Sequence, residues 1–471
     1  MSRFGAVSSA AILLWSALAS AGGFLIYEHG ATGTGMCGAR TASADDPSPM
    51  FFNPAAITEL EGIQLELGST AILGYLSYQP AGRPADPRTY STFDANGNPV
   101  VEIVNDGENP ADAKVKLFTP LHLYATWRPR GLPLAVGYGL NNPFGLGTYW
   151  PGNWDGRFIT TETEMRTFVN NLSVALDVAE LAGFKDSVKL SVAVGYMFVY
   201  GQAHLARRID LRAAEAFSNG AIQDPWGEMK MDGDAIGHGW NVALYAELPK
   251  LLALGFSLRS GVSLPFEGTA RFLFPMESGQ QARAFLEGLG TVFPDEDTGS
   301  VEINLPMNLN AGVAFLGVER LKVALDFYLA FFSSYRELAM KFNCVDEGTC
   351  TAALNTSIPT RWHSSWQISL GAEYLLTDYL PLRLGWGTVS SPVPDDTYDP
   401  TLPDGQRQLI TVGTGYHGSW WKLDIGYMLA FWKGTKDNDV GHGDDLNPEG
   451  KANGTYTTYS HLLGLTFAAR F

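Results

Sequence analysis

The sequence predicts an all-β fold: a 14-stranded antiparallel transmembrane β-barrel with an N-terminal hatch that plugs the lumen. The main observation is strict alternation of side chains. In residues 459–471 one parity is apolar or aromatic and ends on Phe471, whereas the other carries Ser460, Gly464, Thr466 and Arg470. Side chains on a strand alternate between its faces, so an apolar row facing lipid and a small or polar row facing a lumen indicate a membrane-spanning strand.

The second observation is that this pattern recurs along the chain. Residues 321–331, 380–386 and 421–431 keep all their charged side chains on one parity, and 303–315 keeps its asparagines on one parity. A water-soluble β-sandwich would also alternate, but it would turn its apolar row inward and would need no aromatic rims. The repeated alternation therefore favours a barrel in the outer membrane of a bacterial cell.

The first 21 residues resemble a secretory signal peptide. Arg3 gives a basic start, residues 10–18 form a short apolar stretch, and Ala19-Ser20-Ala21 supplies a small-residue cleavage site. We expect the mature chain to begin at Gly22. The apolar stretch is too short for a transmembrane helix, and no later uncharged apolar run reaches the required ~18 residues.

Composition agrees with an exported barrel. The 52 glycines and 57 aromatic residues (26 Phe, 19 Tyr and 12 Trp) suit turns, tight lumen packing and interfacial girdles. The net charge of -17 argues against nucleic acid as a partner, because a phosphate-binding surface needs clustered Lys and Arg.

Alternation between turn signals predicts about 14 strands, an even number as single-chain bacterial barrels require. The predicted strands are 62–79, 117–129, 133–147, 166–179, 188–205, 238–249, 252–274, 300–317, 321–342, 360–376, 380–390, 407–417, 419–433 and 456–471. Short turns alternate with long polar segments, which are 80–116, 206–237, 275–299, 391–406 and 434–455. We expect the short turns in the periplasm and the long loops outside.

Residues 22–61 fit no strand pattern. They are rich in Gly and Ala and contain the turn Asp45-Asp46-Pro47 and the motif Asn53-Pro54-Ala55. The segment is too compact in character for a loose tail, so we expect a hatch over 22–61 inside a barrel formed by 62–471.

These features resemble the long-chain fatty-acid transporter family of the FadL/TodX type. The start Gly23-Phe24 and the Asn53-Pro54-Ala55 motif are similar to the family's N-terminal hatch, and residues 137–147 are similar to its kinked third strand. Further matches at 154–158 and 391–404 extend the resemblance over essentially the whole mature chain.

The resemblance implies an outer-membrane transporter of long-chain fatty acids or other hydrophobic small molecules, and no enzyme. Its cargo would leave through a lateral opening, for which we expect Asn141, Asn142, Pro143, Phe144 and Gly145. Proline cannot donate a ladder hydrogen bond and glycine lacks a side chain, so strand pairing is weakened there. An ordinary bulge near the barrel rim is the alternative.

Hatch residues are expected at the ligand site. The resemblance places the ring of Phe24 near a central pocket, where entering ligand would shift the N-terminal segment, and it assigns Asn53, Pro54 and Ala55 to the same gating unit. A purely structural anchor is the alternative for Phe24. Expected partners also include outer-membrane lipid, lipopolysaccharide and the barrel-assembly machinery.

Two long loops each contain a helix-like stretch, over 212–217 and 280–289. Their apolar side chains predict an extracellular groove, or else pack one loop onto the other. The groove residues are Phe217, Phe285, Leu286 and Leu289.

Charges on the lumen-facing parity either pair with one another or hold a carboxylate. They are Lys322, Asp326, Arg383, Lys422 and Asp424.

The three cysteines predict one possible disulfide, between Cys344 and Cys350, because the exported compartment permits it. No zinc spacing is present, so no metal is expected. The acidic loop with Asp437 and His442 predicts a solvated surface, with a calcium or lipopolysaccharide contact as the alternative. Residues 33–38 spell GxGxxG without a preceding strand, so no dinucleotide cofactor is expected.

Two other classes of outer-membrane barrel compete with this interpretation. A lipase-like enzyme needs a nucleophile and a base together on the outer rim, and no Ser-His pairing stands out. A general porin keeps an open aqueous lumen, whereas this chain places about 40 residues before its first strand.

Overall fold

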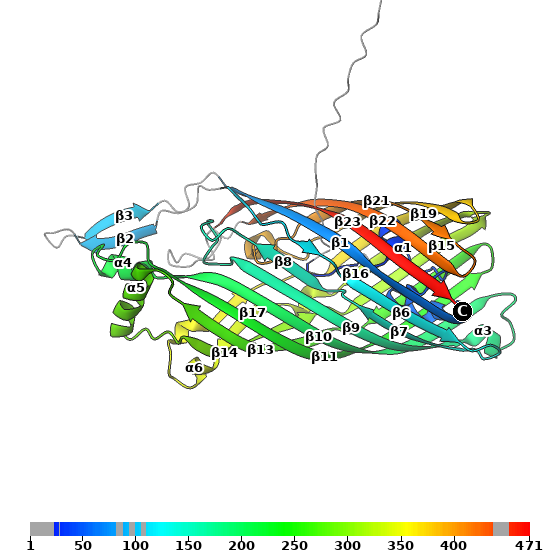
Figure 1. Cartoon of the computed structure of the whole chain (residues 1–471), viewed down its shortest axis with the longest axis horizontal. Helices are drawn as coiled ribbons and strands as arrows, with labels where there is room; N and C mark the ends of the chain where they lie inside the picture. Colours follow the sequence, from blue (N-terminus) through cyan, green and yellow to red (C-terminus); the bar gives the residue numbers. More distant parts are fainter. Residues whose placement is uncertain (1–22, 28, 82–87, 94–98, 105–109, 437–451) are drawn as a thin grey trace, which may run out of the picture.

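The computed structural model describes residues 23–27, 29–81, 88–93, 99–104, 110–436 and 452–471. Within these ranges the chain forms a closed barrel of fourteen antiparallel strands, several of them interrupted (Figure 1). The predicted fold class is confirmed. The signal peptide 1–21 and the acidic residues Asp437, Asp439, His442, Asp444 and Asp445 lie outside the described residues.

The first and last strands of the barrel wall pair with each other. β1 pairs with β23 from Gln64 opposite Arg470 to Pro80 opposite Gly454, which closes the barrel. The wall strands are β1 (Gly62–Pro80), β6 (Leu121–Arg128), β7 (Leu134–Asn141) continued by β8 (Gly145–Tyr149), β9 (Glu162–Asp177), β10 (Lys189–Asp210), β11 (Trp226–Leu248), β12 (Leu252–Arg259) continued by β13 (Val262–Leu273), β14 (Glu296–Leu305) continued by β15 (Asn308–Val318), β16 (Leu321–Ala330) continued by β17 (Glu337–Phe342), β18 (Thr356–Pro359) continued by β19 (Ser365–Thr377), β20 (Leu380–Val389), β21 (Gln406–His417), β22 (Trp421–Lys436) and β23 (Gly454–Arg470). Two short pieces, β4 (Ala111–Asp112) and β5 (Leu117–Phe118), pair with β1.

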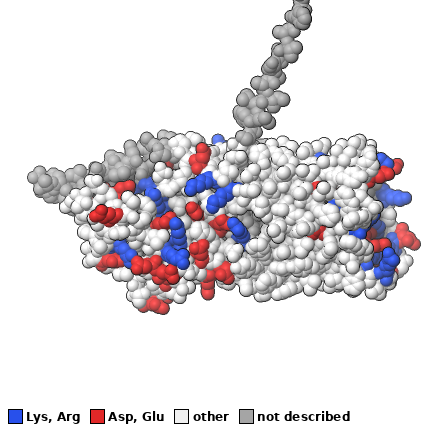
Figure 2. Space-filling view, viewed as in Figure 1, with Lys and Arg blue, Asp and Glu red and all other residues white. Residues whose placement is uncertain are grey.

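The alternation read from the sequence sorts side chains as expected. On β23, Leu463 and Leu465 are 48% and 53% exposed, whereas Ser460 is fully buried against the interior. On the face drawn in Figure 2, a broad band that is nearly free of charge lies between a charged half of the molecule and a narrow charged end. An uncharged, apolar band of this kind is what the hydrocarbon layer of the membrane requires. Among the described residues no helix has the length and apolarity needed to cross a bilayer.

The two ends of the barrel differ. One end carries tight turns, such as those at Lys250 and Arg320 with positive φ, and the short helix α3 (Val178–Leu181). The other end carries the hairpin of β2 (Arg88–Phe93) and β3 (Pro99–Val104) and the loop helices (Figure 1). These are α4 (Arg212–Phe217), α5 (Glu277–Gly288) and α6 (Asn343–Asp346), with 3-10 turns η2 (Phe332–Ser334), η3 (Ala352–Leu354) and η4 (Asp395–Thr397).

One loop prediction is wrong in extent. The segment 206–237 was expected to be a loop, but β10 runs to Asp210 and β11 already starts at Trp226. These strand ends lie toward the charged end of the barrel and alternate Lys230 and Asp232 with methionines, so they lack the apolar row by which the membrane strands were recognised. Strand pairing continues there above the lipid band.

The N-terminal segment, residues 23–61, lies inside the barrel. Its helices are α1 (Ala31–Gly35), α2 (Pro49–Phe52) and the 3-10 turn η1 (Pro54–Glu59). α1 packs on β21, β22 and β23, and η1 packs on β9, β10 and β11. The close approach of α1 depends on glycine, because a Cβ on Gly35 would lie 3.1 Å from the Cα of Gly413.

Candidate functional site

The wall is interrupted between β7 and β8. β7 pairs with β6 as far as Asn141 opposite His122, and with β9 on its other side. β8 pairs with β9 alone, while β4 and β5 pair with β1. Within the described residues, the facing edges of β5 and β8 are therefore not joined by ladder pairing. Pro143 lies at the break, where it has no N–H to donate.

This gap forms a window with defined ends. At one end the Leu121 amide donates to Asn142 Oδ1 at 2.9 Å, and at the other the Lys114 amide donates to Tyr149 O at 2.7 Å. Between them lies a cavity of about 350 Å³. It is lined from both edges of the gap, by Leu117, Phe118, Leu121, Phe144, Gly145 and Gly147 among others.

The window reaches from the interior to the outer surface of the wall. Its lining includes Leu117 and Leu121, which are 59% and 42% exposed, as well as the buried Leu462 on β23 and the inner residue Ile26. A Cβ on Gly147 would collide with the ring of Phe118 across the gap. The space is therefore kept by the missing side chain of Gly147, and its walls are mainly apolar.

The start of the N-terminal segment occupies the inner edge of the break. Leu25 forms an antiparallel bridge with Phe144. The Ile26 amide donates to Pro143 O at 2.7 Å, and the Gly145 amide donates to Phe24 O at 2.9 Å. The segment thus supplies hydrogen-bond partners that a neighbouring wall strand would otherwise provide.

Phe24 sits in an aromatic cage. Its ring centroid lies 5.3 Å from that of Phe332, 5.8 Å from Trp362, 6.0 Å from Tyr335 and 6.1 Å from Phe144. Edge-to-face contacts at such distances add to the stability of a packed aromatic cluster. Phe24 therefore links the N-terminal segment to the break on one side and to the β16–β19 wall on the other.

Two smaller cavities adjoin the window. A cavity of about 60 Å³ toward the long-loop end shares Leu146 and Met165 with the window and is also lined by Phe24. An inner cavity of about 30 Å³ shares Phe144 with the window and is lined by Asn141 and Pro143. All five residues predicted for a lateral opening thus border the window cavity or the inner cavity.

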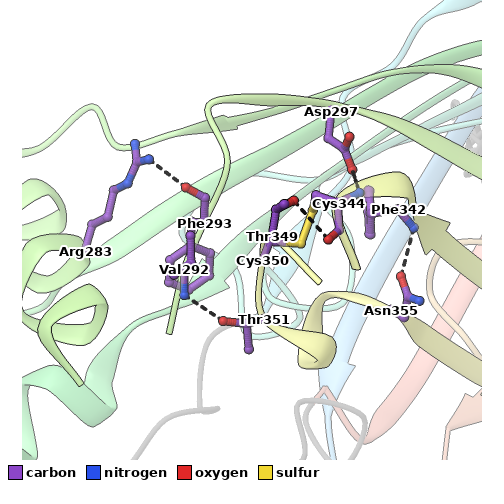
Figure 3. Close-up of a disulfide and its surroundings, with 10 residues drawn as sticks. All are labelled: Arg283, Val292, Phe293, Asp297, Phe342, Cys344, Thr349, Cys350, Thr351 and Asn355. Carbon is purple, nitrogen blue, oxygen red and sulfur yellow. Dashed lines mark hydrogen bonds between the residues drawn. A yellow bond between two sulfur atoms is a disulfide. The ribbon is translucent and has the colours of Figure 1, made fainter. Parts of the chain in front are cut away.

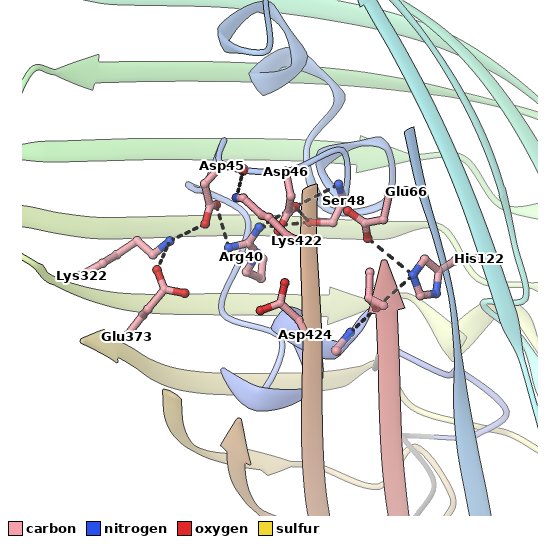
Figure 4. Close-up of polar contacts among 12 residues, drawn as sticks. Arg40, Asp45, Asp46, Ser48, Glu66, His122, Lys322, Glu373, Lys422 and Asp424 are labelled. Carbon is pink, nitrogen blue, oxygen red and sulfur yellow. Dashed lines mark hydrogen bonds and ion pairs between the residues drawn. The ribbon is translucent and has the colours of Figure 1, made fainter. Parts of the chain in front are cut away.

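A buried ion network fixes the N-terminal segment to the wall (Figure 4). Arg40 contacts Asp45 at 2.8 Å and Asp46 at 2.7 Å, and Lys322 of β16 contacts Asp45 at 3.1 Å. Burial alone would raise the pKa of the Asp45 carboxyl, but the Arg40 and Lys322 charges bring that pKa well below its usual range. Asp45 therefore stays ionised in this network.

The lumen charges named from the sequence all have partners. Lys322 also contacts Glu373 at 3.2 Å, and Lys422 donates to Asp45 O. Arg383 lies 2.6 Å from both Glu373 and Asp424. The carboxylate of Asp326 accepts the backbone amides of Arg40 and Thr41 at 2.9 and 2.7 Å. These contacts support the interpretation that the lumen charges pair with one another, and not the alternative that they hold a carboxylate ligand.

The Asn53-Pro54-Ala55 motif anchors the segment rather than lining these cavities. The Asn53 side chain accepts from the Ala55 amide and donates to Thr41 O at 2.8 Å and to Leu244 O of β11 at 3.0 Å. Pro54 and Ala55 are fully buried at the start of η1. The motif therefore fastens η1 to the wall opposite α1.

The long-loop end brings α4 and α5 into contact (Figure 1). Phe285 and Leu286 pack on the core, whereas Phe217 and Leu289 are exposed. Nearby, a disulfide joins Cys344 to Cys350, and the Val292 amide donates to Thr351 Oγ1 at 2.7 Å (Figure 3). The disulfide loop thus supports the chain that follows α5.

The sequence reading missed Arg259, at the end of β12. Arg259 lines the inner cavity and is 9% exposed. The alternation of side chains along β12 could have identified it. Ala253, Gly255 and Ser257 lie on the same face of the strand as Arg259 and form a row of small, inward-facing residues. Leu254 and Phe256, on the opposite face, are exposed. A cation at the end of such a row is predicted to face the lumen.

Comparison with known proteins agrees with this architecture. A family model described as outer membrane protein transport protein (OMPP1/FadL/TodX) matches residues 12–471. The chain belongs to this family. The resemblance inferred from the hatch and third-strand motifs is thereby confirmed, and a FadL/TodX-type barrel resides in the outer membrane.

Individual FadL/TodX relatives have low sequence identity to this chain but align with it over nearly their whole length. The 47 kDa outer membrane protein of Pasteurella multocida is 25% identical over 98% of this chain and 97% of its own. The long-chain fatty acid transport protein of Salmonella typhi is 23% identical, with 94% of each chain covered.

Solved structures share the fold. A Pseudomonas aeruginosa FadL homologue aligns with a TM-score of 0.78 at 19% identity, covering 95% of this chain and all of that one. The P. putida toluene transporter TodX gives 0.66 at 15% identity, covering 94% and 99%.

Proposed function

We propose that this protein carries hydrophobic molecules, long-chain fatty acids or related apolar compounds, across the outer membrane and releases them sideways into the lipid. The observation that carries the proposal is the apolar window between β5 and β8 in a barrel whose interior is filled by residues 23–61. An apolar solute gains about 0.8 kcal/mol per methylene on leaving water, so a dry route through the wall suits it.

The route begins at the outer loops. Exposed Phe217 and Leu289 on α4 and α5 collect the solute, which passes the cavity beside Phe24 and reaches the window through Leu146 and Met165. Residues 23–61 act as a hatch that blocks the aqueous path, held by Arg40 and its partners. The cargo then leaves between Phe118 and Gly147.

The competing classes have less support. A porin needs an aqueous lumen, which the buried α1 and η1 fill. A barrel enzyme needs a serine and a histidine in contact, whereas the polar side-chain partners of the histidines in the described part of the wall are tyrosine, threonine, aspartate and glutamate. A transporter that catalyses no reaction therefore explains these contacts better than a barrel enzyme does.

Uptake assays test the proposal. The full precursor is expressed in a bacterial host that lacks its own transporter, and labelled oleate, labelled toluene and a labelled disaccharide are offered separately. We expect uptake of at least one hydrophobic solute to rise while that of the disaccharide stays at background. A rise for the disaccharide alone would establish a porin instead.

Removing Gly22 to Phe24 from the mature chain tests the trigger role of Phe24. We expect hydrophobic uptake to fall about tenfold, because the segment that responds to ligand beside Phe144 is lost, a change equivalent to ~1.4 kcal/mol. Assembly is checked by heat-modifiable mobility in gels, and Phe24→Leu serves as the conservative control. Unchanged uptake by an assembled barrel would exclude the trigger role and leave Phe24 as a structural anchor of the N-terminal segment.

A further inference from the structure

The outward-facing surface of β9, β10 and β11 ends its apolar part at one common level. The pairing of these three strands places Phe168, Tyr200 and Ile236 side by side, and we call these residues the aromatic level. The rings of Phe168 and Tyr200 stack with their centroids 6.3 Å apart. Aromatic side chains are enriched where a barrel strand leaves the hydrocarbon of the membrane, so the aromatic level marks the rim of the lipid-facing band.

Directly beyond the aromatic level, the outward-facing residues are polar on all three strands. The next two levels contain, in order, Arg166, Gln202 and Asp234, and then Glu164, His204 and Asp232. Figure 2 shows charged side chains of both signs gathered beyond the nearly uncharged band. The limit of the hydrocarbon layer on the long-loop side therefore falls between the aromatic level and these polar residues.

The two polar levels enclose a cavity of about 340 Å³ that opens on the outer side of the wall. We call it the headgroup cavity. The six polar residues line it together with Ala203 and Gly233, whose small size leaves the hollow unfilled. Its two sides, on β9 and β11, are two strand spacings apart, which is about 9–10 Å. The cavity is thus continuous with the lipid-facing surface and has hydrogen-bonding groups on both sides.

The β9 side of the headgroup cavity offers cations. The side chain of Arg166 is 59% exposed, and in the described part of the chain it contacts Glu164 alone, so most of its N–H donors are free. The exposed Lys116 lies nearby, with its Nζ 3.2 Å from the centroid of the Tyr149 ring, and the Tyr149 hydroxyl bonds to Glu164. A guanidinium and an ammonium on one side of a cavity suit a phosphate group.

The β11 side offers acceptors. Asp232 lies 2.7 Å from His204 Nδ1, and Nε2 of the same ring lies 3.7 Å from Glu162. Asp234 is exposed and has no hydrogen bond or ion pair with any described residue. Ionised carboxylates only accept hydrogen bonds, so this side suits a ligand that carries hydroxyl or amide N–H donors.

The occupant has to match the aromatic level as well as the headgroup cavity. Acyl chains suit the aromatic level, and a headgroup with both phosphate and many donors suits the cavity. The chain belongs to a family of the bacterial outer membrane, whose outer leaflet consists of lipopolysaccharide. The lipid A anchor of lipopolysaccharide is a phosphorylated glucosamine disaccharide with several acyl chains, whereas phosphatidylglycerol has a single phosphate and few donors.

We propose that the headgroup cavity is a specific site for the lipid A part of one lipopolysaccharide molecule. Arg166 and Lys116 bind a phosphate, Asp234 accepts hydrogen bonds from the sugar, and the acyl chains lie over the aromatic level. Arg166 also lines the window, so the bound lipid stands at its outer edge. The inference concerns the outer surface of the wall and is independent of what the barrel transports.

Native mass spectrometry of the purified mature chain tests the proposal. The protein is titrated with diphosphoryl lipid A or with phosphatidylglycerol, in EDTA so that no divalent ion bridges lipid and protein. We expect one lipid A to bind at least tenfold more tightly than phosphatidylglycerol. Combining Arg166→Gln with Lys116→Gln is expected to raise the Kd for lipid A about ten- to hundredfold, and Asp234→Ala about tenfold, because each removes hydrogen bonds to a charged group.

Arg271→Gln provides a matched control. Arg271 of β13 is exposed to nearly the same extent as Arg166, 56% against 59%, and it also pairs with a glutamate, Glu296. It does not line the headgroup cavity, so we expect this variant to bind both lipids as the wild type does. Heat-modifiable mobility reports folding, which these exposed changes should preserve because exposed ion pairs contribute little to stability.

The results distinguish a site from a generally charged surface. Loss of lipid A affinity that is confined to the cavity variants supports the site. Equal affinity of the wild type for lipid A and phosphatidylglycerol would refute it, as would an equal loss in Arg271→Gln and in the double variant. Lipid A binding that is unchanged in the double variant would refute it as well.

Discussion

Replacing Gly147 with alanine, leucine and tryptophan in turn is expected to reduce uptake of hydrophobic solutes progressively, with the tryptophan variant close to background. Even a Cβ at Gly147 meets the ring of Phe118 across the window, and a longer side chain fills the space between β5 and β8. Forcing extra groups into a packed site costs about 1–3 kcal/mol. A cargo that must displace them loses about ten- to hundredfold in rate.

A second-site change provides the control for this series. Phe118→Ala removes the ring that Gly147→Leu would collide with, so the double variant should regain part of the lost uptake. The single Phe118→Ala change should leave uptake at or above the wild-type level. If uptake does not depend on the size of the side chain at position 147, the cargo does not pass through the window.

Replacing Arg40 with methionine is expected to loosen the hatch. Arg40 is fully buried between Asp45 and Asp46, and removing one partner of a buried ion group costs about 3–5 kcal/mol. We expect ion conductance in planar bilayers and sensitivity of cells to large hydrophilic antibiotics, because the lumen opens when residues 23–61 shift. Purified wild-type protein should conduct little.

Two variants sharpen this test. Arg271→Met breaks an exposed pair with Glu296 and should leave conductance unchanged, since exposed pairs contribute about 0–1 kcal/mol. Adding Asp45→Asn and Asp46→Asn to Arg40→Met removes the stranded charges and should restore part of the seal. If the Arg40→Met barrel conducts no more ions than the wild type, the ion network does not hold the hatch.

Much of the barrel could be predicted from sequence because membrane strands have a strong signal. Lipid imposes an apolar row and the lumen a polar one, so β20 and β23 were located nearly to the residue. The signal ends where lipid ends, which is why the last five residues of β10 and the first twelve of β11 were assigned to a loop. Local turn chemistry found the break at Pro143, but pattern alone could not say that β8 pairs with β9 and is not joined by ladder pairing to the described edge of β5.

The candidate site was harder to predict because it depends on contacts across the lumen. Leu25 meets Phe144, and Arg40 meets Lys322 through Asp45, over separations that no local pattern encodes. The lumen charges were recognised, and the contacts of the structure support pairing among them. Arg259 was overlooked because it closes a row of small residues rather than standing beside another charge.

The central claim is that cargo leaves through the wall while the hatch stays in place, and one disulfide tests it. Cys37 of the hatch takes no part in the native disulfide, and a Cβ on Gly387 of β20 would lie 2.7 Å from its Sγ. That is close to the ~3 Å between a Cβ and the partner sulfur in a disulfide, so Gly387→Cys should lock the hatch to the wall.

The measurement is hydrophobic uptake by cells carrying Gly387→Cys, before and after mild oxidation and again after reduction. Mass analysis of the Cys37 peptide confirms that the lock has formed. The account predicts the same uptake in all three states, because residues 23–27 at the window remain able to move. Uptake that stops on oxidation and returns on reduction would mean that cargo passes through the lumen past a displaced hatch, and would contradict the lateral route.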